Sequence, residues 1–427
     1  MLKQVVAFRD VDRAHLLHKS YGDEAALETA VRGIIQDVRA RGDEAVREYT
    51  RRFDGVDFAQ GCRVSPEEME EASKKADPAI CREVARAKDN IEAFHVKQKR
   101  VSWMEPKGDG CVLGQLMIPL QRVGIYVPGG TAPYLGSVLM NAVPARVAGV
   151  EEIVMATPPQ ADGSVLPEML VAALLCGVKE IYKMGGAQAI AAMAYGTSTI
   201  GKVDKITGPG NIYVTLAKKL VYGSVDIDML AGPSEILILA DADGKPEELA
   251  ADLLSQAEHD VLASAILISP DRGLLEATVS EVEKQVELLP RSEIARASWE
   301  KYGAAILVED LEQGMELVNA VAPEHFELVV RDPYAWLGKV RNAGAVFIGR
   351  STPEPVGDYF AGPNHILPTG GAARFFSVLD VDAFMKKTSV IQYSQEALQR
   401  DAGSIMALAR KEGFEAHARA VEKRLGK

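Results

Sequence analysis

The first part of the chain carries apolar residues at the spacing of one helix face, most clearly across Ala26–Phe53. The run Ser65–Glu68 combines a capping serine, a proline at the first helical position and a glutamate three residues after the cap. Asp77, followed by a proline, indicates a second helix start that runs toward His95. We therefore expect roughly the first 100 residues to be mainly helical.

From about Val123 the pattern changes to short apolar runs that alternate with helix-like segments. Glycines stand at the ends of several runs, and a second series of the same kind begins at Glu235. Such alternation is typical of parallel, doubly wound sheets. The pattern predicts an α/β fold with two Rossmann-like lobes, followed after Asp382 by residues that look helical again.

Composition and charge narrow the range of partners. The chain has 427 residues, too many for one ordinary core, and 48 basic against 60 acidic side chains give a formal net charge of −12. Nucleic acids and anionic membranes need a cationic face, and no basic run supplies one. We therefore expect neither as a partner.

The cellular location follows from what the sequence lacks. Its most apolar stretch, Met169–Val178, is too short to cross a bilayer, and the N-terminus does not resemble a secretory signal. The four cysteines are scattered, without a CxxC pair. This favours reduced thiols and a cytoplasmic protein.

Two polar pairs could carry chemistry. Gln256 and His259 are three residues apart on a predicted helix, so both could reach one metal ion; alternatively they form a polar helix end. Glu324 and His325 stand where a loop enters an apolar strand, and they supply two proton acceptors for successive steps. The alternative for that pair is a turn with a solvated acid.

Two further segments are less specific. The run Gly357–Phe375 is rich in glycine and proline; within it Asp358 could be an oxygen ligand and His365 could donate to a carboxylate, unless the run is a structural loop. Glu412 and His417 lie on a helical stretch near the chain end, where a histidine is often a surface or core residue.

Glycine-rich turns offer places where a backbone could approach a nucleotide. They occur at 124–130, 185–196 and 206–214, each with a helix start behind it. No GxGxxG fingerprint is present, so the turns permit a dinucleotide site without indicating one. Ser234 adds a polar group at the entrance to a strand.

Taken together, these segments resemble one family. The motifs GPSEILILAD, LLSQAEHD, PEHFEL, GDYFAGPNHILPTGGAARF and EGFEAHA occur in one order along the chain, after GIYVPGG. In order and spacing they resemble the histidinol dehydrogenases, and the resemblance covers most of the chain. Five long motifs in sequence are far more specific than any single one.

The resemblance implies a role for individual residues. It implies zinc binding, with one Zn²⁺ per subunit, by Gln256, His259, Asp358 and His417. It implies that Glu324 and His325 are the acid–base pair. Histidinol is then held by Ser234, His325, Asp358, His365 and Glu412, with Gln256, His259 and His417 bordering it through the metal. The implied NAD contacts are Tyr126, Gln188 and Asn211.

The family fold implies two incomplete Rossmann-like domains with helical N- and C-terminal extensions. We expect an N-terminal extension at 1–22, domain 1 at 23–122 and 235–380, domain 2 on the NAD side at 123–234, and a C-terminal extension at 381–427. The resemblance also implies a homodimer with shared active sites. In such a dimer the last extension carries Glu412 and His417 into the partner's site.

The implied reaction is the NAD-dependent, four-electron oxidation of L-histidinol through L-histidinaldehyde to L-histidine, the last steps of histidine biosynthesis. His325 then serves as base in both hydride transfers, and Glu324 activates water between them. Three alternatives fit part of the pattern: a related dehydrogenase for another small alcohol such as a sulfonated propanediol, a zinc hydrolase, and a binding protein without catalysis. The set Ser234, His365 and Glu412 fits the histidinol pattern.

Overall fold

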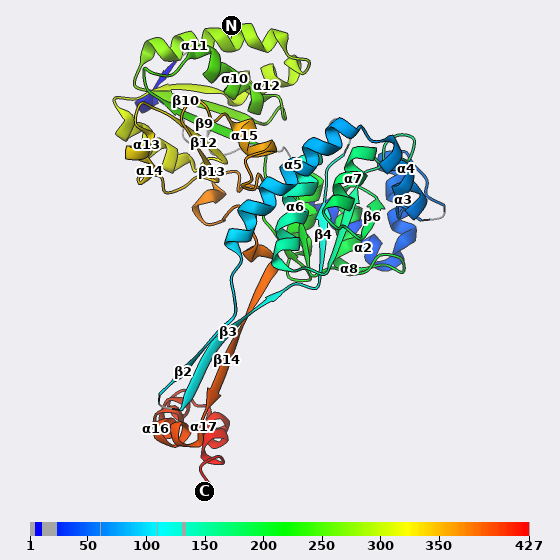
Figure 1. Cartoon of the computed structure of the whole chain (residues 1–427), viewed down its shortest axis with the longest axis vertical. Coiled ribbons are helices and arrows are strands. Elements are labelled where there is room, and N and C mark those ends of the chain that lie inside the picture. The colour runs from blue at the N-terminus through cyan, green and yellow to red at the C-terminus, as the bar shows by residue number, and fades with distance from the viewer. Residues whose placement is uncertain (1–4, 11–23, 60, 109, 130–133, 427) are drawn as a thin grey trace. The chain divides into compact units, whose positions relative to one another are not determined.

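The computed structural model describes residues 5–10, 24–59, 61–108, 110–129 and 134–426. By its internal contacts the chain divides into two compact units (Figure 1). The first consists of Met1–Gln98 and Gln121–Phe384, and the second of Lys99–Leu120 and Met385–Lys427. None of the helices among the described residues is both long and apolar enough to cross a bilayer.

A six-stranded parallel sheet forms the first lobe of the first unit, in the order β1-β11-β10-β9-β12-β13. Its strands are β1 (Val6–Ala7), β9 (Glu235–Ala240), β10 (Ser264–Ser269), β11 (Ala304–Leu307), β12 (His325–Val329) and β13 (Ala345–Ile348). Helices cover both of its faces (Figure 1). They include α10 (Pro246–Ala257), α11 (Arg272–Gln285), α12 (Ser292–Tyr302) and α13 (Leu311–Val321).

Strand β9 shows why the apolar run at Glu235 folds as a central strand. Successive side chains of a strand point to opposite faces. Ile236 and Ile238 therefore join the core under α10, α11 and α12, while Leu237 and Leu239 join the core under α13. A run that is apolar at every position is what a sheet covered on both faces requires.

A five-stranded parallel sheet forms the second lobe, in the order β6-β5-β4-β7-β8. Its strands are β4 (Arg122–Tyr126), β5 (Glu152–Thr157), β6 (Glu180–Lys183), β7 (Lys205–Thr207) and β8 (Asp226–Ile227). The connecting helices are α6 (Leu135–Ala148), α7 (Pro167–Leu175), α8 (Gly186–Tyr195) and α9 (Ile212–Val221). The chain winds outward in both directions from β4, so a switch point lies between β4 and β7. The predicted doubly wound α/β fold is confirmed.

The N-terminal helices pack on this second lobe. They are α2 (Glu24–Arg41), α3 (Asp43–Asp54), α4 (Pro66–Lys75) and α5 (Pro78–His95). Helix α2 packs on α8 and α9, α4 on α7, and α5 on α6. The capping serine is confirmed, since Ser65 and Glu68 form a complete capping box.

This packing differs from the expected domain division. Residues 23–122 were expected to belong with 235–380, but the apolar face of α2, including Val31 and Val38, is buried against the lobe that contains 123–234. Residues 99–120 lie in the second unit. Within the expected extension at 1–22, Val6–Ala7 pairs with β11, and most of the remainder lies outside the described residues.

The second unit is a three-stranded antiparallel sheet with two helices. Strand β3 (Cys111–Pro119) pairs with β2 (Trp103–Lys107) and β14 (Met385–Tyr393). Helices α16 (Gln395–Lys411) and α17 (Glu415–Glu422) follow β14 and pack on each other. The C-terminal extension was expected to be helical throughout, and β14 is therefore a correction.

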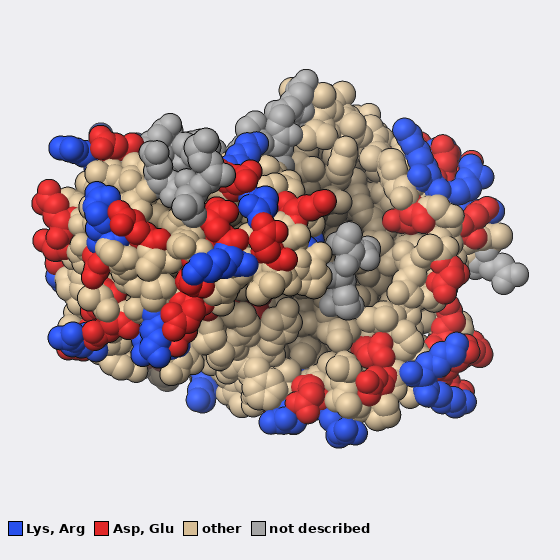
Figure 2. Space-filling view, turned by 90° about the horizontal axis from the view of Figure 1, so that it is seen from above, with Lys and Arg blue, Asp and Glu red and all other residues tan. Residues whose placement is uncertain are grey.

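The charged side chains are mixed on the molecular surface. On the face that Figure 2 shows, Lys and Arg side chains lie among Asp and Glu side chains. Exposed ion pairs of the described residues include Arg331 with Asp243 and Arg350 with Glu248. Pairs of this exposed kind contribute little to stability.

Candidate active site

Glu324 and His325 meet at the amino end of β12, beside the start of β9. The backbone N–H of Glu235 donates to Glu324 Oε2 at 2.8 Å. His325 Nδ1 lies 3.0 Å from the carbonyl oxygen of Glu235, so this nitrogen carries the proton that it donates. The Nε2 of a neutral His325 is therefore left as the proton acceptor.

Two carboxylates of α15 (Glu354–Tyr359) face this free nitrogen. His325 Nε2 lies 3.7 Å from Glu354 Oε1 and 3.7 Å from Asp358 Oδ1. Ligand atoms of the three residues all lie within 4.8 Å of one another, close enough to hold one metal ion. Glu354 and Asp358 are four residues apart, which places both carboxylates on one side of the short helix.

The buried charges shift the pKa values of this group strongly. Burial raises the pKa of Glu324 to about 7. Burial by itself lowers the pKa of His325, but the carboxylates of Glu324, Asp358 and Glu354 raise it to about 10. Burial and the Asp358 carboxylate raise the pKa of Glu354 to about 9. Although burial acts in the opposite direction, the imidazoles of His325 and His365 hold the pKa of Asp358 below its usual range.

Gln256 lies in the last turn of α10, and His259 comes two residues after this helix ends. Gln256 is fully buried, and neither its amide oxygen nor its amide nitrogen has a hydrogen-bond partner among the described residues. His259 follows the helix in a turn, where burial lowers its pKa while the charge of Asp358 raises it. A buried amide without a partner is costly, so a ligand that meets Gln256 is expected here.

The glycine-rich loop after α15 joins the two lobes. His365 Nδ1 lies 3.0 Å from the backbone carbonyl oxygen of Asp358 and 3.8 Å from its carboxylate oxygen Oδ1. The start of α6 packs on the same ring, because a Cβ built on Gly136 would lie 3.2 Å from His365 Cε1. Ser234 directly precedes β9 and pairs through its backbone carbonyl with the N–H of Ser264.

The predicted nucleotide residues gather at the carboxyl edge of the five-stranded sheet. Tyr126 ends β4, and its hydroxyl accepts the N–H of Gly186 at 3.1 Å. Gln188, on α8, is 1% exposed and its amide has no partner among the described residues. Asn211 caps α9 by accepting the N–H groups of Tyr213 and Val214. This edge beside a switch point is the usual ligand site of doubly wound sheets.

Gly208 fixes the turn that carries Asn211. Its φ is +115°, and a Cβ at this position would lie 2.0 Å from the carbonyl oxygen of Tyr126. Only glycine fits such a close backbone approach. Gly130, the last glycine of the predicted turn at 124–130, lies outside the described residues.

The last two predicted residues lie in the second unit. Glu412 caps the end of α16, and His417 lies on α17 with its ring 5.2 Å from that of Phe414. Both side chains are exposed in the single chain. The first unit holds every other predicted site residue, so these two are the ones that it does not contain.

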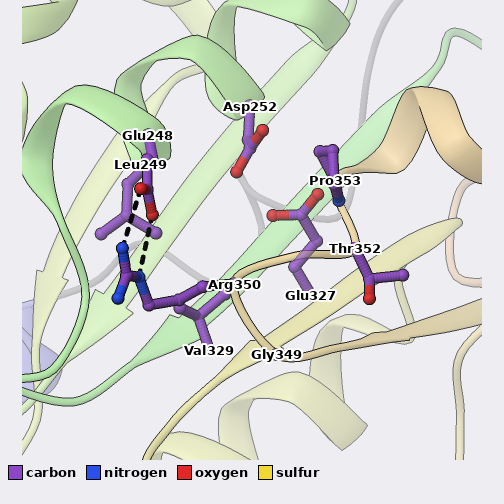
Figure 3. Close-up of a pocket in the computed structure, with 9 residues that line it drawn as sticks. All are labelled: Glu248, Leu249, Asp252, Glu327, Val329, Gly349, Arg350, Thr352 and Pro353. Atoms are coloured by element: carbon purple, nitrogen blue, oxygen red, sulfur yellow. Dashed lines mark hydrogen bonds and ion pairs between the residues drawn. The ribbon is translucent and has the colours of Figure 1, made fainter.

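A small pocket lies along β12, the strand that begins at His325 (Figure 3). Its lining includes Glu327, two residues after His325 and on the same face of the strand. Figure 3 shows the carboxyl groups of Asp252 and Glu327 directed into the same space, beside the ion pair of Arg350 with Glu248. Burial, and then Asp252, raise the pKa of Glu327 to about 9.

Comparison with known proteins decides the family. A family model described as histidinol dehydrogenase matches residues 17–425. A histidinol dehydrogenase of Heliobacterium mobile is 55% identical over 425 residues, which cover 99% of this chain and 100% of the relative. The chain belongs to the histidinol dehydrogenase family. A second family member, from Bacillus subtilis (strain 168), is 55% identical over 394 residues, 92% of each chain.

A solved structure agrees with this assignment. The crystal structure of histidinol dehydrogenase from Elizabethkingia anophelis matches with a TM-score of 0.92 and 38% identity, covering 97% of this chain and 96% of that chain. The sequence resemblance to the histidinol dehydrogenases is thus confirmed. Sequence reasoning missed Glu354, whose only signal is its spacing of four residues from Asp358 after a proline.

Proposed function

We propose that this protein oxidises L-histidinol through L-histidinaldehyde to L-histidine with NAD, the last steps of histidine biosynthesis. Its relatives carry the name histidinol dehydrogenase at 55% identity over 99% of the chain. The observation that supports the chemistry most directly is the buried pair of Glu324 and His325, in which the Glu235 carbonyl fixes His325 Nδ1 and leaves Nε2 as the nitrogen that exchanges a proton with the substrate. No feature of the site favours the sulfonated propanediol alternative.

In the first oxidation, His325 Nε2 accepts the proton of the substrate hydroxyl while the carbon that bears this hydroxyl transfers a hydride to NAD. The carbonyl of Glu235 holds the ring in the required tautomer through Nδ1. Because Nε2 is buried, the aldehyde product stays away from bulk water until the second step.

In the second oxidation, Glu324 accepts a proton from the water that adds to the aldehyde, while His325 returns the proton it took from the alcohol to the carbonyl oxygen, so that a neutral hydrate forms and His325 is a base again. A pKa of about 7 suits a carboxylate that must take up and release a proton near neutral pH. His325 then accepts the hydroxyl proton of the hydrate as the second hydride leaves. Two NADH form for each histidinol consumed.

We propose that Gln256, His259 and Asp358, with His417 of a second copy, bind one zinc ion. The unpartnered amide of Gln256 supports this set, since a metal ion would meet its carbonyl oxygen. Asp358 supports it as well, because its carboxylate faces two imidazoles and stays ionised. Zinc, when bound, orients the imidazole and amine nitrogens of the substrate and offsets the carboxylate charge beside His325.

We propose a homodimer in which the second unit of one chain reaches the site of its partner. In the single chain every residue of β2 is exposed, and so are large apolar side chains of the same unit. They include Trp103, Met104, Ile391, Leu408 and Phe414. A second copy that covers this surface would bring Glu412 and His417 to the metal and the substrate. None of the four cysteines, all of them among the described residues, is in a disulfide, which supports a cytoplasmic location.

The decisive experiment measures NADH formed per L-histidinol consumed, with and without a metal chelator. The proposal predicts two NADH per substrate and loss of turnover after chelation, restored by Zn²⁺. A zinc hydrolase or a binding protein would give no NADH. Turnover of a propanediol sulfonate in preference to histidinol would identify the related dehydrogenase instead.

A further inference from the structure

Asp54 is a half-buried residue that the proposed reaction does not use. It is the last residue of α3, and its Oδ2 has no hydrogen-bond partner among the described residues. Its other oxygen, Oδ1, lies 3.5 Å from the position of a Cβ built on Gly185, at the start of α8. The N–H of Gly185 donates to this carboxylate, while burial raises the pKa of Asp54 to about 6.

Asp54 shares this place with Tyr126 and Gln188. Burial raises the pKa of Tyr126 to about 12, and the charge of Asp54 contributes to that rise. The buried amide of Gln188 has no partner among the described residues. Three polar side chains from α3, β4 and α8 therefore meet with hydrogen-bonding capacity that the described residues leave unused, which points to a bound polar ligand.

Pro158 packs closely against Gly129 and Gly185, beside these three side chains. A Cβ on Gly185 would lie 2.7 Å from Pro158 Cγ, and one on Gly129 would lie 3.2 Å from the Pro158 carbonyl oxygen. These residues follow β6, β5 and β4 in turn, so they belong to the carboxyl edge of the sheet. Glycine at 129 and 185 lets Pro158 pack closely against the loops at this edge, since a side chain at either position would press on it.

The hydrogen-bond partners identify the chemistry of the ligand group. The N–H groups at the start of α8 already donate, from Gly185 to Asp54 and from Gly186 to Tyr126. A phosphate would lack hydrogen-bond donors here, because both N–H groups already have acceptors, and the Asp54 carboxylate would repel it. A hydroxyl group, by contrast, can donate to the free Oδ2 of Asp54, and a ribose offers such hydroxyls.

We propose that Asp54 binds a ribose hydroxyl of NAD and thereby selects NAD over NADP. A 2′-phosphate in the same place would bring negative charge against the Asp54 carboxylate and lose the hydroxyl donor. The inference rests on the proposed NAD-linked activity. Asp54 is a specificity-determining residue in this view, and also an N-terminal cap of α8.

The test compares Asp54→Asn with Asp57→Asn in the zinc-loaded enzyme. Asp57 is a matched control, since it lies three residues later on the surface in an ion pair with Arg47. Calorimetric titration with NAD and with NADP, without histidinol, measures both affinities, and thermal unfolding reports the cap. We expect Asp54→Asn to lower the NAD affinity about tenfold or more, as loss of a charged hydrogen bond does. NADP binding should hold or improve, and Asp57→Asn should leave the ratio unchanged.

Each outcome separates the two roles of Asp54. If Asp54→Asn lowers the melting temperature while both affinities stay or fall by the same factor, Asp54 is only a helix cap and the proposal is wrong. Equal binding of NAD and NADP by the unaltered enzyme would also overturn it. An unaltered enzyme that prefers NAD through Asp54 but does not oxidise histidinol would refute the proposed function and leave this inference standing.

Discussion

Replacing Lys218 tests whether a buried ion pair supports the nucleotide edge. Lys218, on α9, is paired with Asp228, and their side chains are 3% and 1% exposed. The ammonium donates to the carbonyl oxygen of Gly208 at 2.9 Å, and Asp228 Oδ2 accepts the N–H of Gly208 at 2.8 Å. The pair therefore binds both the N–H and the carbonyl oxygen of Gly208, three residues before Asn211.

Lys218→Met keeps most of the side-chain volume and removes the charge. Removing one partner of a buried ion pair costs about 3 to 5 kcal/mol, because the other charge stays buried without compensation. Asp228 retains the N–H groups of Gly208 and Met229. These two hydrogen bonds place the expected loss of unfolding free energy near the lower end, at about 3 kcal/mol.

The next residue provides the control. Lys219 is 53% exposed and pairs with Glu28 at 3.1 Å, so Lys219→Met should cost about 0 to 1 kcal/mol. Urea unfolding at pH 7.5 measures the free energy of unfolding of both variants. Titration with NAD shows whether the turn at Gly208 still supports NAD binding. A second change, Asp228→Asn, should restore part of the stability lost in Lys218→Met by removing the unpaired charge. A Lys218→Met protein within about 1 kcal/mol of the Lys219 control would refute the reasoning.

The remaining predictions concern the site and its surroundings. His325→Ala should abolish NADH formation while metal analysis still finds zinc, whereas His259→Ala should lose the zinc itself; normal turnover of the first variant would remove His325 as the base. Folded Glu327, with a pKa of about 9 against 4.5 in the unfolded chain, holds a proton that the unfolded chain releases, so stability falls as pH rises between these values. Glu327→Gln should flatten that dependence and raise the melting temperature at pH 8, and an unchanged pH profile would contradict the shift. Gly208→Ala should destabilise the protein by about 3 kcal/mol or more and impair NAD binding, because its φ of +115° and the Tyr126 carbonyl leave no room for a Cβ. Gly223→Ala, at a φ of +95° with open space around it, should cost less, and equal unfolding midpoints would count against the steric argument.

The sequence predicts elements well where burial imposes a pattern. Ile236–Ala240 is apolar at every position because both faces of β9 are covered, and Ser65 marks a helix start because its cap is local. Strand β14 was not predicted because its residues are mostly exposed, so its sequence does not need to alternate between apolar and polar residues. Periodicity also shows that α2 has an apolar face without showing which lobe that face meets, and the expected domain division failed there.

The site residues also differ in how far the sequence alone can identify them. Glu324 and His325 are adjacent in sequence, so a motif can identify them, whereas Glu354 and Asp54 become candidates only when the fold brings them to His325 and to Tyr126. A carboxylate after a proline or at a helix end reads as a surface group in a local pattern. Tertiary packing buries Glu354 and encloses the Oδ2 atom of Asp54, and this enclosure is what marks the two carboxylates.

The two halves of the proposed reaction lie on opposite kinds of sheet edge. Glu324 and His325 stand at the amino end of β12, whereas Tyr126 stands at the carboxyl end of β4. Helix α6 comes after β4 in the chain and starts against His365, whose Nδ1 lies 3.0 Å from the backbone carbonyl oxygen of Asp358 on α15. A carboxyl edge in one lobe and an amino edge in the other can serve one reaction only if such a helix joins them. Side chains introduced at Gly136 should therefore disturb hydride transfer more than the binding of either ligand alone.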